Sequence, residues 1–351
     1  ASFNFGACFV QVIEALMFRC MPTRIVYALA VLFGMIGSVL MIVALPAKSA
    51  PLLFIGRVLS GLIAGNQLFL RLNTVNAHEP VERREQIFRM DTLVMQICLS
   101  LAAIVSVFFL QFSSLNFDDA LNAATMPYFL PIVLNILVLI ALATLWPRVP
   151  ESVFAQKKSS FVGTVDELSL GALWSAVVPQ LLIVVASSAL MGIKLFLIYV
   201  YNDRLWKYSL SSITILSSLI ELGGVLTVPL DKYIKRIPAL SIGISCVSIL
   251  IIADWDQTWP PVWLFSIASI LLTSNARIVY TEALTEASKL INRCPSMHGT
   301  IQLMLSVSME LGLGLGGFLI GLIDRTWITC IGVVALLLIS VVWATVVRCV
   351  I

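Results

Sequence analysis

Long apolar runs, separated by short charged or proline-containing breaks, fill almost the whole of this 351-residue chain. A helix needs about 20 mostly apolar residues to cross the hydrocarbon core of a bilayer. Eleven runs approach or exceed this length, at about residues 5–18, 24–46, 52–77, 87–112, 126–147, 175–200, 209–229, 238–254, 260–285, 299–323 and 326–348. Most are too long for barrel strands, and backbone in lipid must satisfy its own hydrogen bonds, so we expect an all-α, polytopic membrane protein.

The composition excludes a soluble domain. Hydrophobic residues make up 60% of the chain and charged residues 12%, whereas soluble domains have about 45–50% and 25%. The seven cysteines show no metal-ligand spacing, so we expect neither a metal nor another cofactor. No HExxH, GxSxG or phosphate-loop motif is present, so we do not expect an enzyme. The expected partners are the lipid bilayer and a small molecule or ion, and not nucleic acid.

Basic residues predict the orientation of the chain, because short loops rich in Lys and Arg stay in the cytoplasm. One side of the expected membrane holds only four of them, Lys48, Arg204, Lys207 and Arg325. The other side holds fourteen, which are Arg19, Arg24, Arg83, Arg84, Arg89, Arg148, Lys157, Lys158, Lys232, Lys235, Arg236, Lys289, Arg293 and Arg348. The second side is therefore predicted to be cytoplasmic, and it includes a charged connection at residues 79–85.

The longest polar interruption predicts two bundles. Residues 148–174 carry charges, serines and a proline, and we interpret them as a cytoplasmic linker between an N-terminal bundle at 1–147 and a C-terminal bundle at 175–351. Five expected spans precede the linker and six follow it. We therefore expect one further helix upstream of Ala1, so that eleven helices are visible of twelve in two six-helix bundles.

Two motifs carry a resemblance to the major facilitator superfamily. Residues 57–65, RVLSGLIAG, resemble the R-x-x-x-G-x-x-A-G motif on the fourth helix of that family. Residues 227–236, TVPLDKYIKR, are similar to its loop motif G-x-x-x-D-R-x-G-R-K, with both glycines replaced. The resemblance covers essentially the whole chain and implies two six-helix bundles joined by a cytoplasmic loop. It also implies a gating role for the loop residues Asp231, Lys232, Lys235 and Arg236.

Residues 64–71 point to a branch within that superfamily. The sequence AGN, followed by Arg71 and a loop rich in Glu and Arg, looks more like the endolysosomal branch that includes the ceroid-lipofuscinosis membrane protein. Residues 96–112 lack the Gly-Pro motif of the proton-coupled drug antiporters. This resemblance implies an endolysosomal membrane, with the plasma membrane as the alternative.

Polar residues inside the expected spans are the candidate functional residues, because charged groups are costly in lipid and commonly face a bundle interior. The candidates for a substrate or coupling-ion pathway are Glu14, Arg57, Asn66, Arg71, Lys194, Glu221, Asn275, Arg277 and Glu310. Asn66 and Asn275 fall at equivalent places in the two halves of the chain.

Each charged candidate has a plainer alternative. Arg57, Arg71 and Lys194 could extend their long side chains to the membrane surface. Glu221 and Glu310 could load and release a proton, since burial favours the protonated form of a carboxyl group. Alternatively, Glu310 could form a structural pair with Arg277 on the preceding expected helix.

These features predict a secondary active transporter that works by alternating access. Because the charged candidates are of both signs, we expect a small anionic or zwitterionic solute, and we hypothesise that proton coupling through Glu221 or Glu310 is the energy source. Two alternatives stay open: a channel-like anion conductance on the same fold, and a receptor or scaffold that does not transport. The sequence predicts no oligomeric state.

Overall fold

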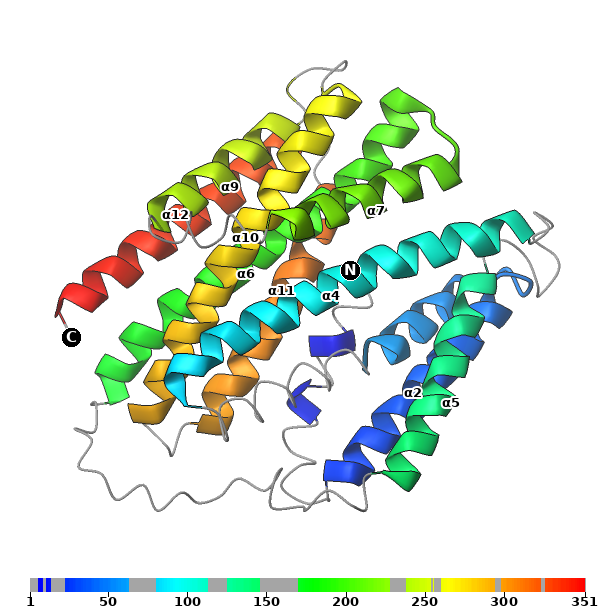
Figure 1. Ribbon diagram of the computed structural model, residues 1–351, viewed down its shortest axis with the longest axis horizontal. Coiled ribbons are helices and arrows are strands. Elements are labelled where there is room, and N and C mark those ends of the chain that lie inside the picture. Colours follow the sequence, from blue (N-terminus) through cyan, green and yellow to red (C-terminus); the bar gives the residue numbers. More distant parts are fainter. Residues whose placement is uncertain are drawn as a thin grey trace. The chain divides into compact units, whose positions relative to one another are not determined.

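The protein is helical throughout the part that the computed structural model describes (Figure 1). The described residues are 6–8, 11–13, 23–62, 80–112, 125–145, 170–227, 238–253, 255, 260–293, 298–322 and 326–350. Their regular elements are all helices, so the predicted all-α polytopic fold is confirmed.

The helix bounds follow the apolar runs. The long helices are α2 Thr23–Ala44, α4 Val81–Phe112, α5 Phe129–Thr144, α6 Leu170–Tyr201, α7 Leu210–Leu226, α9 Pro238–Ile252, α10 Val262–Arg293, α11 His298–Leu322 and α12 Thr326–Val350. A further helix covers Ala50–Leu62. A 3-10 turn, η1 Met126–Tyr128, precedes α5, and a π-helical turn, η4 Asn202–Trp206, extends α6. The expected run at 5–18 and the second half of the run at 52–77 lie mostly outside the described residues.

Two predicted boundaries are wrong. The charged connection expected at 79–85 is helical from Val81 onward, directly after Pro80. Proline favours the start of a helix, and Glu, Arg and Gln are good helix formers, so this segment winds into α4. Helix α6 begins at Leu170, within the segment expected to be linker. Most of that linker lies outside the described residues.

Five of the described helices are long and apolar enough to cross a membrane: Arg24–Ala44, Gly171–Trp206, Val262–Leu290, Thr300–Leu322 and Thr326–Val347. Four shorter apolar helices accompany them, at Ala50–Leu62, Phe129–Thr144, Leu210–Leu226 and Ala239–Ile252. With about 30 Å of hydrocarbon to span at 1.5 Å per residue, the five longer helices suffice in length.

The chain forms two compact units. The first contains residues 1–80, 108–165 and 296–310, and in it α2 packs against α5. The second contains residues 81–107, 166–295 and 311–351. Within the second unit α10 packs against α6, α7 and α9, and α12 packs against α6 and α9 (Figure 1). The division into two bundles around a linker at 148–174 stays a prediction.

Glycines of α11 allow its backbone to touch that of α6 in the second unit. A Cβ atom added to Gly312 would meet the carbonyl oxygen of Val185, and one added to Gly316 would meet that of Ala189. Small residues let membrane helices approach closely, where van der Waals contact holds them together. These glycines therefore set the distance between α6 and α11.

We predict that Gly316→Ala destabilises the protein, because the neighbouring atoms belong to the backbone of α6 and cannot rotate away. Overpacking of this kind costs about 1–3 kcal/mol. Gly321→Ala on the same helix is the matched control, since nothing lies within 4 Å of its added Cβ. The measurement is thermal unfolding of both purified variants in detergent. Equal melting temperatures for the two variants would contradict the predicted contact.

Candidate functional site

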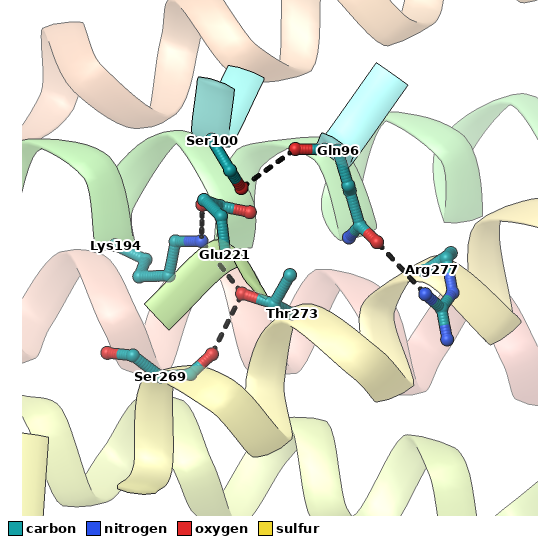
Figure 2. A network of polar contacts seen from close by, with 7 residues as sticks. All are labelled: Gln96, Ser100, Lys194, Glu221, Ser269, Thr273 and Arg277. Atoms are coloured by element: carbon teal, nitrogen blue, oxygen red, sulfur yellow. Dashed lines mark hydrogen bonds and ion pairs between the residues drawn. The ribbon is translucent and has the colours of Figure 1, made fainter. Parts of the chain in front are cut away.

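A buried ion pair joins α6 to α7 in the second unit. The ammonium group of Lys194 on α6 donates to the carboxylate of Glu221 on α7, and its second partner is Oγ1 of Thr273 on α10, at 2.7 Å (Figure 2). The exposed fractions of Lys194 and Glu221 are only 4% and 8%. One charged group thus links three helices from the interior of the unit.

The local sequence of α7 lets α10 come close to this pair. A Cβ atom on Gly224 would lie 2.9 Å from Cγ2 of Thr273, and one on Gly223 would lie 2.7 Å from the side chain of Ile270. Both glycines follow Glu221 within one turn of the helix. The absence of side chains at these positions therefore brings Thr273 within reach of the Lys194 ammonium.

Hydrogen bonds within the helices satisfy the nearby hydroxyl groups. Ser218 donates to the carbonyl oxygen of Thr214 at 2.9 Å, and Thr273 donates to that of Ser269 at 2.8 Å. Since the Thr273 hydroxyl has given its proton to Ser269, its lone pairs accept from Lys194. The direction of each bond in the network follows from this assignment.

Arg277 lies one turn beyond Thr273 on α10 and binds two further elements. Its Nη1 donates to Oε1 of Gln96 on α4 at 2.9 Å and to the carbonyl oxygen of Gly224 on α7 at 3.3 Å. Only 2% of Arg277 is exposed. The guanidinium group therefore ties α4 and α7 to α10, as Lys194 ties α6 and α7 to it (Figure 2).

The buried face of α4 is polar. Residues four apart along the helix are buried in turn, namely Arg84, Phe88, Thr92, Gln96 and Ser100. Nη1 of Arg84 donates to the backbone oxygen of Ser288 on α10 at 3.1 Å. Arg84 was expected in a cytoplasmic loop, and its burial follows from the earlier start of α4.

The other predicted pathway residues lie in different places. Arg57 is exposed on the helix Ala50–Leu62 of the first unit. Glu310, on α11, is buried and belongs to the first unit. Its pairing with Arg277 stays a prediction. Asn275 is buried and donates to the carbonyl oxygen of Leu271 on its own helix at 2.8 Å. Glu14, Asn66, Arg71 and the loop residues Asp231, Lys232, Lys235 and Arg236 lie outside the described residues.

The structure overturns one alternative drawn from the sequence and adds two site residues that were not predicted. The alternative that Lys194 extends to the membrane surface is wrong, because its ammonium is buried against Glu221. Gln96 and Thr273 were not predicted as site residues, since a neutral polar side chain in an apolar run gives little signal. Each has a polar residue four positions further along its helix, Ser100 after Gln96 and Arg277 after Thr273. This helical spacing is the sequence feature that could have indicated them.

The gap beside the ion pair is narrow. It is lined by Lys194, Ser217, Glu221, Phe265 and nearby apolar side chains, and it is too narrow to admit a water molecule. Among the described residues no group of three or more His, Cys, Asp or Glu side chains could hold a metal ion.

Comparison with known proteins places this geometry in a familiar fold. Residues 1–161 match the family model described as "Sugar (and other) transporter". The human organic anion transporter MFSD10 (TETRAN) is similar in structure, with a TM-score of 0.67 and 14% identity over 97% of this chain and 82% of that one. A comparison with curated protein sequences gives no significant match.

Two further solved structures share the fold. The E. coli fucose:proton symporter FucP matches with a TM-score of 0.57 and 14% identity, over 99% of this chain and 89% of its own. The nucleoside transporter NupG matches with a TM-score of 0.54 and 16% identity, over 99% and 88% of the two chains.

We predict that Lys194 and Glu221 are coupled in stability. Glu221→Met or Lys194→Met alone leaves a buried charge without its partner, which costs about 3–5 kcal/mol, whereas replacing both by methionine removes the pair and is close to neutral. Thermal unfolding should therefore show two strongly destabilised single variants and a double variant near wild type.

The exposed pair Lys289–Glu286 on α10 is the matched control. Its side chains are 49% and 30% exposed, and exposed pairs contribute about 0–1 kcal/mol. The same cycle of methionine substitutions should change stability little there. Additive effects of the Lys194 and Glu221 substitutions would contradict the coupling.

Proposed function

We propose that this chain is a membrane transporter of the major facilitator superfamily and that it carries a small anionic or zwitterionic solute by alternating access. The fold and the family match over residues 1–161 support the first part of this proposal. The observation that carries the proposal is the buried contact of Lys194 with Glu221 and Thr273. A carrier of this kind rocks two helical bundles about a site near the middle of the membrane.

The pair is costly as a structural device. Desolvation of two ions offsets much of their attraction, and apolar replacements of such pairs are often neutral or stabilising. We therefore interpret a charged pair inside a membrane helix bundle as functional rather than structural. The ammonium group of Lys194 is a cation that an anionic group of the solute could bind, whereas apolar side chains could not bind it.

A competition for Lys194 would couple the solute to a proton. In the structure Glu221 is the counter-ion of the ammonium group. An anionic solute that binds Lys194 displaces Glu221, and the released carboxylate, now buried without a cation, takes up a proton. One anion and one proton then cross together without net charge. We propose that the conformational change that admits the solute and the proton also widens the gap beside Lys194 and Glu221.

The relatives by fold support this proposal in outline. One of the similar structures is an organic anion transporter and another is a fucose:proton symporter. For this chain we propose, by analogy, an anionic solute and coupling of its transport to protons.

Several earlier predictions remain part of this proposal. Arg57, Arg71, Asn66, Asn275 and Glu14 are proposed to line the pathway or hold its helices. Glu310 is proposed as a second proton-accepting group, and the loop Asp231–Arg236 as a gate on the cytoplasmic side. The endolysosomal membrane, with the plasma membrane as alternative, also stays a prediction.

The first test is uptake of labelled candidate carboxylates into liposomes that hold the reconstituted protein, with proton and chloride gradients imposed separately and the membrane current recorded in parallel. We expect solute accumulation that saturates and follows the proton gradient. Glu221→Gln should abolish accumulation driven by the gradient while leaving downhill exchange of the solute, because the glutamine cannot release a proton. Glu286→Gln, at a half-buried position on α10 away from the Lys194 pair, is the control and should behave as wild type.

Other outcomes would assign a different function. A sustained current that reverses at the chloride potential indicates a channel and overturns the carrier. A complete absence of flux, with the same partner protein bound by wild type and by Arg57→Ala, indicates a receptor or scaffold. Accumulation that survives both Glu221→Gln and Glu310→Gln means that neither glutamate couples transport to protons.

A further inference from the structure

Gln96 on α4 holds a buried hydrogen-bond donor that the network leaves unused. Its exposed fraction is 3%, and its Nε2 atom has no hydrogen-bond partner among the described residues. On the same face of α4, the hydroxyls of Thr92 and Ser100 bind the carbonyl oxygens of Phe88 and Gln96. Buried polar groups are nearly always paired, so an unpaired donor at this position needs an explanation.

The orientation of this amide is fixed by its neighbour. Oε1 of Gln96 accepts from Nη1 of Arg277 at 2.9 Å. A guanidinium group can only donate, so a flipped amide would set NH₂ against a donor. Nε2 therefore stays on the other side of the amide, where Figure 2 shows it turned toward Glu221 and Thr273. Neither of its two N–H groups has an acceptor among the described residues.

Helix geometry relates this donor to Lys194. Thr273, which binds the Lys194 ammonium, and Arg277, which binds Gln96, are four residues apart on α10. One turn of helix separates them by roughly 6 Å along its axis and keeps them on one face. The Lys194 ammonium and the Gln96 amide therefore both bind side chains on the same face of α10, one turn apart. Both groups are donors, an ammonium and an amide.

We propose that Gln96 Nε2 and the Lys194 ammonium together bind one carboxylate group of the transported solute, so that Gln96 is a specificity-determining residue. This inference rests on the proposed function and names the chemical group that the site selects. A carboxylate has two oxygens that accept and none that donates, and bonds from charged or amide donors to it are stronger than neutral ones. When the carboxylate takes the place of Glu221 on Lys194, Nε2 of Gln96 donates to its second oxygen.

The test exchanges this one atom. Gln96→Glu keeps an oxygen for Arg277 and replaces the Nε2 donor by a second carboxylate oxygen, which repels the carboxylate of the solute. The probes are lactate, succinate and para-aminobenzoate, each compared with its amide, in binding and uptake measurements on the reconstituted protein. We expect Gln96→Glu to weaken the best carboxylate probe about 10- to 100-fold and its amide much less, which lowers the preference for carboxylate.

Two further variants make this result specific. Gln180→Glu introduces a carboxyl group at another buried glutamine, on α6, and should leave the ratio of carboxylate to amide affinity unchanged. Gln96→Met removes the donor without adding a charge, and should lower carboxylate affinity by a smaller factor than Gln96→Glu. Thermal unfolding checks that each variant is folded, and Gln96→Met supplies the answer if Gln96→Glu does not fold.

The outcomes separate this proposal from the one on which it rests. An unchanged carboxylate-to-amide ratio in Gln96→Glu and Gln96→Met overturns the role of Gln96 and leaves the carrier in place. Uptake of a neutral hexose or nucleoside, with no binding of any carboxylate, overturns the carboxylate subsite but still shows a transporter. Absence of saturable uptake for every probe, together with an ohmic chloride current, overturns both.

Discussion

Polar side chains inside lipid have no water to bind, so each must find its partner within the protein. Many of the described serines and threonines meet this demand within their own helix, as Ser187 and Ser245 do by donating to the carbonyl oxygen four residues earlier. Charged side chains cannot, because a helix's own carbonyls do not balance a full charge. Their partners must come from other helices, and this requirement shapes the second unit.

Lys194 and Arg277 meet the requirement in related ways. Each reaches two other helices, Lys194 through Glu221 and Thr273, and Arg277 through Gln96 and the carbonyl of Gly224. Helix α10 supplies one end of both links, and the glycines of α7 bring it near. Thr227, which stands where the family loop motif has glycine, adds a third link by its 2.6 Å bond to Ser274 on α10. Small and neutral residues of α7 and α10 thus support the contacts of the charged groups.

The helices themselves were predictable, because apolar length alone decides which segments can cross a bilayer. The expected runs at 238–254 and 299–323 end within two residues of α9 and α11. The start of α4 was not predictable from hydropathy, since residues 81–85 are charged yet helical, and the burial of Arg84 depends on Ser288, 204 residues away. The site followed the same division. Glu221 and Lys194 stood out as charges in apolar runs, but nothing in the sequence paired them.

The sequence by itself therefore determined the class of protein, the placement of its helices and the identity of its costly charged residues. These follow from one-dimensional properties: the length of an apolar run and the free energy of a charge in lipid. Only the tertiary structure decided that Lys194 faces Glu221 rather than the membrane surface, and that Gln96 keeps a donor free beside Arg277. Such facts depend on which helix faces lie together. Contact between helix faces is set by the close approach of small residues far apart in the chain, as at Gly224 and Thr273.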